Sequence, residues 1–421
     1  MSDIYQQLAR HLDDLPAGFP STESGVEQRI LKRLFNEEEA EIALGLRMFP
    51  ERISTIARRL GRDEQEMGEK LAGMAKKGLI FRSSKGKRPS YMAAQFVVGI
   101  WEYHLNDLDP DLIRDMNEYI PHLVGNLWAE PETKQMRIIP VSESLDQEMS
   151  VMDYEAAESI IKGQSKIVVA ECICRKEHRM IGQGCEYPLE ACFVFGSGAY
   201  FYEENKLGRS VSQEEALELF RTAVESGLVV QPGNAQKPSN ICMCCGCCCQ
   251  ILKNLKNFDQ PAPLVHSNFF ARIDPDNCTA CGVCAERCHM AAITMDELAV
   301  VDVQRCIGCG VCLAGCEFEA IRLYQKDASE QYVPPENMFA TYAGIARERG
   351  MANDERRMRN AERGAGSGEG GMGNAERGRR NGEGGAGKAE WGRRNGERGT
   401  GNGERGRRNG EGGAGKAEWG R

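Results

Sequence analysis

The sequence predicts a mixed α+β protein of several domains, on three observations. The first 95 residues carry apolar side chains at helical spacing, and short runs of β-branched residues such as 166–170 follow. All 18 cysteines fall between Cys172 and Cys316, whereas the last 71 residues contain 22 glycines. At 421 residues the chain is long enough for two or three domains, each with its own core. A single small domain is therefore excluded.

The charge of the chain is unevenly distributed. Residues 351–421 hold 16 basic and 11 acidic residues, which leaves 37 basic and 51 acidic residues in the first 350. This net charge of −14 on residues 1–350 argues against broad nucleic-acid affinity. No signal peptide is visible in residues 1–10, and no apolar run reaches the ~20 residues of a membrane-spanning helix. We therefore expect a soluble, cytoplasmic protein in which disulfides are not formed.

The first two segments are expected to be mainly helical. Residues 1–24 are expected to form an N-terminal arm or a leading helix. Residues 25–95 contain two helices separated by a turn at Gly61, with Asp63 as the N-cap of the second helix. A hairpin follows, and its tip is placed at residues 85–87.

This order of elements resembles a winged-helix domain of the kind common in transcription regulators. Seven basic residues of the segment could contact phosphates, namely Arg58, Arg59, Lys76, Lys77, Lys85, Lys87 and Arg88. However, Asp63, Glu64 and Glu66 begin the helix that would read bases, where DNA would repel carboxylates. The resemblance implies docking to DNA or to a protein. Protein docking is the favoured interpretation, with nucleic acid as the alternative partner.

Residues 96–265 are expected to form a central α/β cysteine-rich domain. Helical patterns occupy residues 113–119, 154–161 and 211–227, the last with Ser212 as its cap, and residues 136–141 are strand-like. The run 166–170 is rich in β-branched residues and should be a buried strand. That strand would deliver the chain directly to Cys172.

Two copies of one cysteine spacing follow in residues 266–330. The spacing C-x2-C-x2-C-x3-C is formed first by Cys278, Cys281, Cys284 and Cys288, then by Cys306, Cys309, Cys312 and Cys316. Three thiolates on one tight loop can occupy three corners of an iron–sulfur cubane, while the fourth points to another cluster. This crossed scheme assigns Cys278, Cys281, Cys284 and Cys316 to the first cluster, and Cys306, Cys309, Cys312 and Cys288 to the second.

Throughout residues 270–325 these motifs resemble the bacterial-type two-[4Fe–4S] ferredoxin family. The resemblance implies a duplicated ferredoxin-like module that holds two [4Fe–4S] clusters. The proline that commonly follows the fourth cysteine in that family is replaced by His289 and Glu317. His289 could place a protonatable group near the second cluster, although a surface substitution is favoured. Zinc in two four-cysteine sites is the disfavoured alternative, because zinc sites do not usually show this duplicated spacing.

Ten further cysteines precede this module in two groups. The first group is Cys172, Cys174, Cys185 and Cys192, and the second is Cys242, Cys244, Cys245, Cys247, Cys248 and Cys249. Neighbouring side chains of an extended backbone point to opposite faces, so the second group cannot all bind one ion. Arg175 and Lys176 could offset thiolate charge. The ten cysteines could bind a third Fe–S cluster or zinc, or remain a free redox-active set of thiols, and an Fe–S site is favoured.

The order of these cysteine segments is similar to that in a family of iron–sulfur proteins of anaerobes. In that family a CxCR segment and a CxCCxCC segment precede a ferredoxin module. The resemblance spans residues 95–325 and implies a shared cysteine-rich domain rather than a particular reaction.

Residues 331–421 are expected to be a linker and a disordered tail. From residue 355 a glutamate recurs every seven residues, and from 362 a glycine follows it two places later. A heptad with fixed glycine and no apolar positions has nothing to bury, so no core can form from it.

These observations favour an electron-transfer protein or oxidoreductase subunit that passes electrons to a redox protein partner. A stand-alone enzyme is less favoured, since no nucleotide-binding glycine motif is present. The alternatives are an Fe–S redox-sensing winged-helix transcription regulator and a reductase whose active site lies in the cysteine-rich domain. The sequence does not indicate the oligomeric state.

Overall fold

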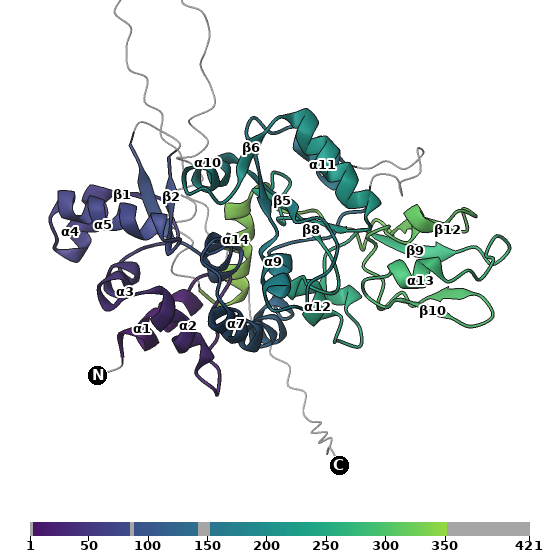
Figure 1. Cartoon of the computed structure of the whole chain (residues 1–421), viewed down its shortest axis with the longest axis horizontal. Helices are drawn as coiled ribbons and strands as arrows, with labels where there is room; N and C mark the ends of the chain where they lie inside the picture. Colours follow the sequence, from purple (N-terminus) through teal and green to yellow (C-terminus); the bar gives the residue numbers. More distant parts are fainter. Residues whose placement is uncertain (1–2, 85–87, 142–151, 352–421) are drawn as a thin grey trace, which may run out of the picture. The chain divides into compact units, whose positions relative to one another are not determined.

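The computed structural model describes residues 3–84, 88–141 and 152–351. It is a mixed α+β structure, as the sequence predicted (Figure 1). The hairpin tip at 85–87, with Lys85 and Lys87, and the repeat-rich tail at 352–421 lie outside the described residues. Within these residues, no helix is both long and apolar enough to cross a bilayer.

The N-terminal part combines helices with a three-stranded antiparallel sheet in the order β1-β3-β2. Its elements are α1 (Ile4–Asp13), α2 (Val26–Leu34), α3 (Glu37–Leu44), β1 (Glu51–Arg52), α4 (Ile53–Leu60), α5 (Glu64–Lys76), β2 (Ile80–Ser83) and β3 (Ser90–Ala93). Asp63 caps α5 by accepting hydrogen bonds from the backbone N–H groups of Gln65 and Glu66, as predicted. α1 buries Leu8 and Leu12, so the N-terminal segment is a packed helix and not an arm.

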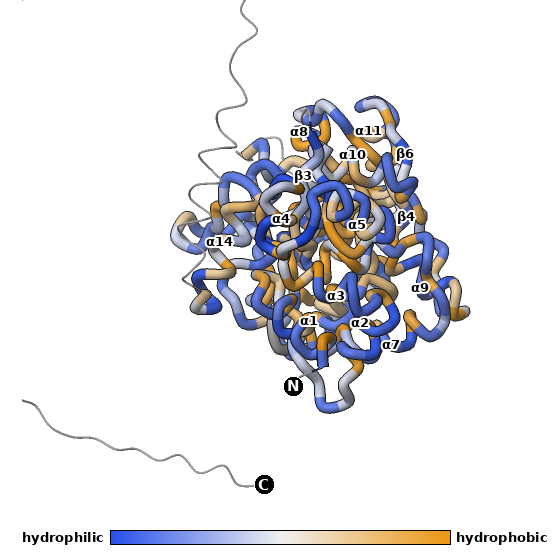
Figure 2. Tube along the Cα trace, turned by 90° about the vertical axis from the view of Figure 1, so that its left-hand side faces the viewer, coloured by the Kyte–Doolittle hydropathy of each residue, from blue (hydrophilic) through white to orange (hydrophobic). Residues whose placement is uncertain are grey.

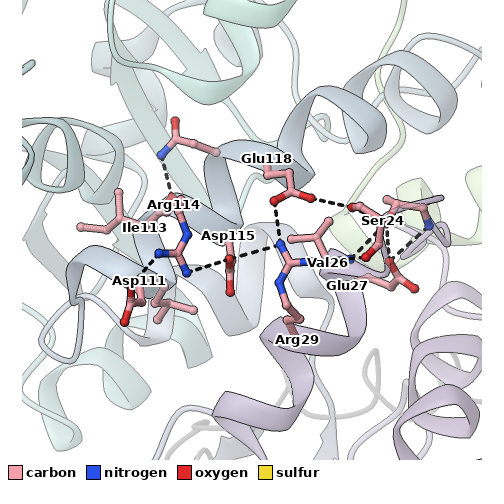
Figure 3. A network of polar contacts seen from close by, with 12 residues as sticks. Ser24, Val26, Glu27, Arg29, Asp111, Ile113, Arg114, Asp115 and Glu118 are labelled. Atoms are coloured by element: carbon pink, nitrogen blue, oxygen red, sulfur yellow. Dashed lines mark hydrogen bonds and ion pairs between the residues drawn. The ribbon is translucent and has the colours of Figure 1, made fainter.

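A polar network joins α2 to α7 (Pro110–Leu123), as Figure 3 shows. Arg29 donates to Glu118 (2.6 Å) and pairs with Asp115 (3.4 Å), while the Ser24 hydroxyl also donates to Glu118 (2.5 Å). Such partly exposed ion pairs contribute about 1 kcal/mol or less each. The apolar face of each helix therefore supplies most of the contact energy. Figure 2 shows the alternation of hydrophilic and hydrophobic residues along these helices.

The central part is built on a five-stranded sheet in the order β6-β4-β5-β8-β7. Its strands are β4 (Ile167–Glu171), β5 (Glu190–Phe195), β6 (Arg209–Val211), β7 (Val229–Pro232) and β8 (Asn240–Cys244). Every strand pair of this sheet is antiparallel, which places the region in the α+β class rather than the expected α/β class. The strand-like run 136–141 forms only two isolated bridges, Met136 with Gly233 and Ile139 with Val230.

Short helices surround this sheet. They are α6 (Trp101–Tyr103), η2 (Val124–Trp128), η4 (Asp153–Glu155), α8 (Ala157–Lys162), α9 (Ile173–Met180), α10 (Gly196–Glu204), α11 (Gln213–Glu225), α12 (Gln250–Leu255) and η5 (Ala262–Leu264). The segment η1 (Phe96–Ile100) is kinked, because Val97, Val98 and Gly99 have non-helical backbone angles. Ser212 caps α11 as predicted, because its side chain accepts a hydrogen bond from the N–H of Glu215.

The C-terminal part repeats one succession of strand, cysteine loop, short helix and strand. Its elements are β9 (Phe269–Ile273), α13 (Val283–Arg287), β10 (Ile293–Met295), β11 (Ala299–Val301), η6 (Leu313–Gly315) and β12 (Ile321–Gln325). β9 pairs with β12 and β10 pairs with β11, both antiparallel, and α13 packs beside β10 (Figure 1). The first strand of one half therefore pairs with the last strand of the other.

The segment expected to be a linker contains a helix, α14 (Met338–Glu348). Its Ile345 and Ala346 are buried, and Arg349 after the helix donates to the carbonyl of Leu15 (2.7 Å) and to Asp13 (3.1 Å). The hydrophobic pattern of residues 338–346 is short and precedes the glycine-rich repeat, so the sequence alone did not separate it from the tail.

His266, before β9, is expected to make stability depend on pH. Its ring stacks on Tyr332 (centroids 3.5 Å apart), and its Nε2 donates to the carbonyl of Glu132 (2.8 Å). Burial lowers the pKa of His266 to about 4, against about 6.5 in an unfolded chain. Folding therefore favours the neutral ring. The stabilisation of the folded state by neutral His266 is complete above pH 6.5 and is lost as the pH falls toward 4.

The measurement is the urea midpoint of anaerobic protein at pH 7.5 and pH 5.0. The wild-type midpoint should fall between these values by more than that of His266→Gln, which cannot take up the proton. An equal fall in both proteins would contradict the assignment.

Candidate metal centres

Two cavities in the C-terminal part are each lined by four cysteines. One of about 340 Å³ is lined by Cys278, Cys281, Cys284 and Cys316, and the other, of about 390 Å³, by Cys288, Cys306, Cys309 and Cys312. Each cavity thus takes its fourth cysteine from the other half of the duplication. The remaining walls are mostly apolar, with Ile273 and Ile321 in the first cavity and Ile293 and Val301 in the second. We call these the first and second ferredoxin cavities, after the family that their cysteine spacing resembles.

Backbone groups of the second ferredoxin cavity are directed at its sulfur atoms. The N–H of Ala271 donates to Cys306 Sγ (3.4 Å), and the N–H of Ala292 donates to Cys288 Sγ (3.2 Å). Hydrogen bonds of this kind tune the potential of a bound cluster. Burial raises the pKa of the Cys309 thiol to about 12, so this buried sulfur becomes a thiolate only when a cation lies beside it.

His289 is a link between the C-terminal part and the CxCCxCC loop, not the surface substitution that the sequence favoured. Its Nδ1 accepts a hydrogen bond from the N–H of Gly246 (3.1 Å), and its Nε2 donates to the carbonyl of Gly227 (2.7 Å). Burial lowers the pKa of His289. One ring nitrogen accepts a hydrogen bond and the other donates one, which is the pattern of a neutral imidazole. His289 therefore joins the two parts by hydrogen bonds and carries no charge at neutral pH.

A third group of thiols, which we call the four-thiol site, consists of Cys185, Cys245, Cys247 and Cys248. All its sulfur atoms lie within 4.8 Å of one another, and Cys185 Sγ is 3.6 Å from Cys248 Sγ and 4.0 Å from Cys245 Sγ. Ligands at about 2.3 Å from a tetrahedral ion are ~3.8 Å apart, so the site fits one ion such as zinc. In the described part of the chain no other cysteine group is this compact.

The remaining six thiols line one larger cavity, which we call the six-thiol chamber. Its volume is about 740 Å³, and its cysteines are Cys172, Cys174, Cys192, Cys242, Cys244 and Cys249. Cys242 and Cys244 share one face of β8 because side chains alternate along a strand. Cys192 on β5 lies directly opposite Cys242.

The structure therefore regroups the ten cysteines that the sequence divided by position. Cys185 leaves the first group to join the four-thiol site, and Cys172, Cys174 and Cys192 join three members of the second group. Adjacent cysteines of residues 242–249 line different sites, in agreement with the expectation that the six do not all bind one ion. Cys244 and Cys249 line the chamber, whereas Cys245 and Cys248 belong to the four-thiol site.

Polar groups of the chamber wall face its sulfur atoms. Gln231 Nε2 lies 3.9 Å from Cys249 Sγ, and Asn240 Nδ2 lies 3.8 Å from Cys242 Sγ. Glu102 also lines the chamber, where its carboxylate accepts the N–H of Gly99 (2.7 Å) and burial raises its pKa to about 8. Sequence reasoning missed Glu102, because a lone glutamate about 70 residues before the first cysteine gives no local signal.

Arg175 lies between the chamber and the four-thiol site and is completely buried. Its Nη1 donates to the carbonyl of Met243 (3.0 Å) and contacts Cys245 Sγ (4.0 Å), while its Nε and Nη2 have no hydrogen-bond partner among the described residues. Burial opposes the charge, but the thiolates of Cys172, Cys244 and Cys245 outweigh burial and raise the pKa of Arg175. Lys176, by contrast, pairs with Glu171 (2.9 Å).

Neither a protein-family model, nor a curated protein, nor a solved structure matches this chain.

Proposed function

We propose that this protein transfers electrons through two [4Fe–4S] clusters, one in each ferredoxin cavity, to a metal centre in the cysteine-rich part. The observation that carries the proposal is the crossed composition of the two cavities. Each combines three cysteines of one loop with the fourth of the other. Four thiolates are the ligand set of a [4Fe–4S] cluster. Since neither set has its sulfur atoms gathered around one point, a cluster suits them better than a single ion.

The contacts between the two parts support a route for the electrons. Cys288 of the second cavity is followed by His289, whose ring accepts from Gly246 between two cysteines of the four-thiol site. The N–H of Val141 also donates to the carbonyl of Cys309 (3.1 Å). The second cluster would therefore be the one next to the cysteine-rich part.

Arg305 fixes this interface. Its guanidinium donates to the carbonyls of Lys256 and Phe258 (each 2.9 Å) and of Met290 (3.0 Å). The first two carbonyls follow α12, where the partial negative charge of a helix C-terminus attracts a cation. A fixed interface keeps the distance between redox centres constant, as a relay requires.

Transcription regulation is the less favoured function, because two of the basic side chains that could contact phosphates are already paired. Lys77 pairs with Glu39 (2.5 Å), and Arg59 pairs with Glu51. Phosphate binding would have to break these pairs. Sequence-preferring, salt-sensitive DNA binding that differs between oxidised and reduced protein would favour regulation instead.

The test of the proposed relay is EPR spectroscopy of anaerobic full-length protein after dithionite reduction. We expect two interacting [4Fe–4S] signals. Cys281→Ser should remove or convert only the first cluster, and Cys309→Ser only the second. Cys247→Ser, in the four-thiol site, is the control and should leave both signals. Unchanged spectra in Cys281→Ser and Cys309→Ser would refute the proposal.

A further inference from the structure

We propose that the six-thiol chamber holds an iron–sulfur centre of two cubanes joined by one bridging ligand. This inference rests on the proposed function in one respect, since it makes the chamber the centre that receives the electrons. It concerns a different set of cysteines, however, and its iron can be counted separately.

The number of thiols is the first argument. Each iron of a cubane binds three sulfides of the core and one ligand outside it, which is why one cubane takes four cysteines. Six thiols are two more than one cubane needs and two fewer than two separate cubanes need. When two cubanes share a bridging sulfide, one iron of each binds the bridge, and six iron atoms remain for thiolates.

The size of the cavity agrees with that count. The chamber is larger than either ferredoxin cavity, each of which is lined by four thiols. Trp101, Trp128 and Tyr202 are among the residues that close it, so much of its wall is apolar and excludes water.

The backbone distributes the six thiols in a way that suits two adjoining halves. Cys172 and Cys174 come from the start of α9, and Cys249 precedes α12, whereas Cys192, Cys242 and Cys244 come from neighbouring strands. Each half therefore supplies three thiols. The two halves meet at the chamber, which all six thiols line.

Charge is the fourth argument. An iron–sulfur core with thiolate ligands is an anion, and a buried anion requires a partner. Arg175 is buried completely, has no carboxylate partner among the described residues, and has two nitrogen atoms without a hydrogen bond. The guanidinium contacts Cys245 Sγ and donates to the carbonyl of Met243, which lies between the chamber residues Cys242 and Cys244. The structure thus provides a buried cation near the thiols whose charge no carboxylate of the described residues balances.

The test counts iron and acid-labile sulfide per chain in full-length protein reconstituted anaerobically with iron and sulfide. We expect about sixteen iron atoms, eight from the ferredoxin cavities and eight from the chamber, apart from one ion in the four-thiol site. The double variant Cys192→Ala/Cys242→Ala should lose about eight. Cys247→Ser is the matched control, and it should lose no more than the single ion.

Other outcomes overturn the inference. About twelve iron atoms in wild-type protein would mean one cubane in the chamber, and about eight would mean none. Cys281→Ser/Cys309→Ser reports on the ferredoxin cavities alone, so failure of the proposed relay would appear as no loss of iron in that variant. Because the wild-type count decides between one and two cubanes, the test does not depend on the folding of a chamber variant.

Discussion

Gly308→Ala is expected to remove the second ferredoxin cluster, with a loss of about four iron atoms per chain. Gly308 has a φ of +64°, and a Cβ at this position would lie 2.0 Å from the carbonyl oxygen of Phe269. A left-handed conformation costs alanine about 1–2 kcal/mol, and the overlap with a backbone atom in β9 adds about 1–3 kcal/mol or more. Relief of this overlap moves Cys306 and Cys309 away from the cavity that both line.

Gly282→Ala is the matched control. Gly282 also has a positive φ, +83°, in the corresponding loop of the first half, but a Cβ there would meet no atom within 4 Å. It should therefore show only the conformational cost of about 1–2 kcal/mol and keep its iron. Iron content and thermal unfolding under nitrogen distinguish the two variants. Equal iron loss in both would mean that contact with Phe269 does not shape the second cavity.

Arg175→Met is expected to lower the metal content of both the six-thiol chamber and the four-thiol site. The substitution keeps much of the side-chain volume but removes the buried positive charge between the two groups of thiolates. An uncompensated buried charge destabilises a protein by about 3–5 kcal/mol, so the folded state would favour protonated thiols, which bind metal poorly. Arg175→Lys retains the charge and should keep part of the metal.

Lys176→Met is the control for this prediction. Lys176 is the next residue, but its ammonium pairs with Glu171 and remains partly exposed, so its loss should change stability by about 1 kcal/mol or less. Iron and zinc contents, measured for each variant after anaerobic purification, report the effect. Wild-type metal content in Arg175→Met would contradict the assigned role of the buried cation.

Features with a local cause could be predicted from the sequence. Asp63 and Ser212 cap helices because a short polar side chain before an amphipathic run reaches the first free N–H groups. The repeated cysteine spacing likewise lies within single loops. The crossed assignment of Cys288 and Cys316 came from the ferredoxin ligand scheme and not from the spacing itself.

Features with a tertiary cause could not be predicted. Cys185 meets Cys245 across 60 residues, and Cys192 meets Cys242 only because β5 pairs with β8. No spacing rule encodes these contacts, so the sequence grouped the cysteines by position and not by site. Glu102 reaches the chamber through the packing of α6, and α14 is held by contacts with residues near the N-terminus. The alternation of side chains along extended backbone anticipated only that the second group would not all bind one ion. It does not apply to Cys248 and Cys249, which lie at the end of the turn after β8 and immediately before α12.

Mössbauer spectroscopy of ⁵⁷Fe-enriched, anaerobically prepared full-length protein is the most direct test of the central claim, that the crossed cavities hold two [4Fe–4S] clusters. We predict that Cys281→Ser/Cys309→Ser lowers the area of the [4Fe–4S]²⁺ doublet by the equivalent of about eight iron atoms per chain. A colourless wild-type protein with zinc in place of iron, or a doublet whose area is the same in the double variant, would contradict the claim.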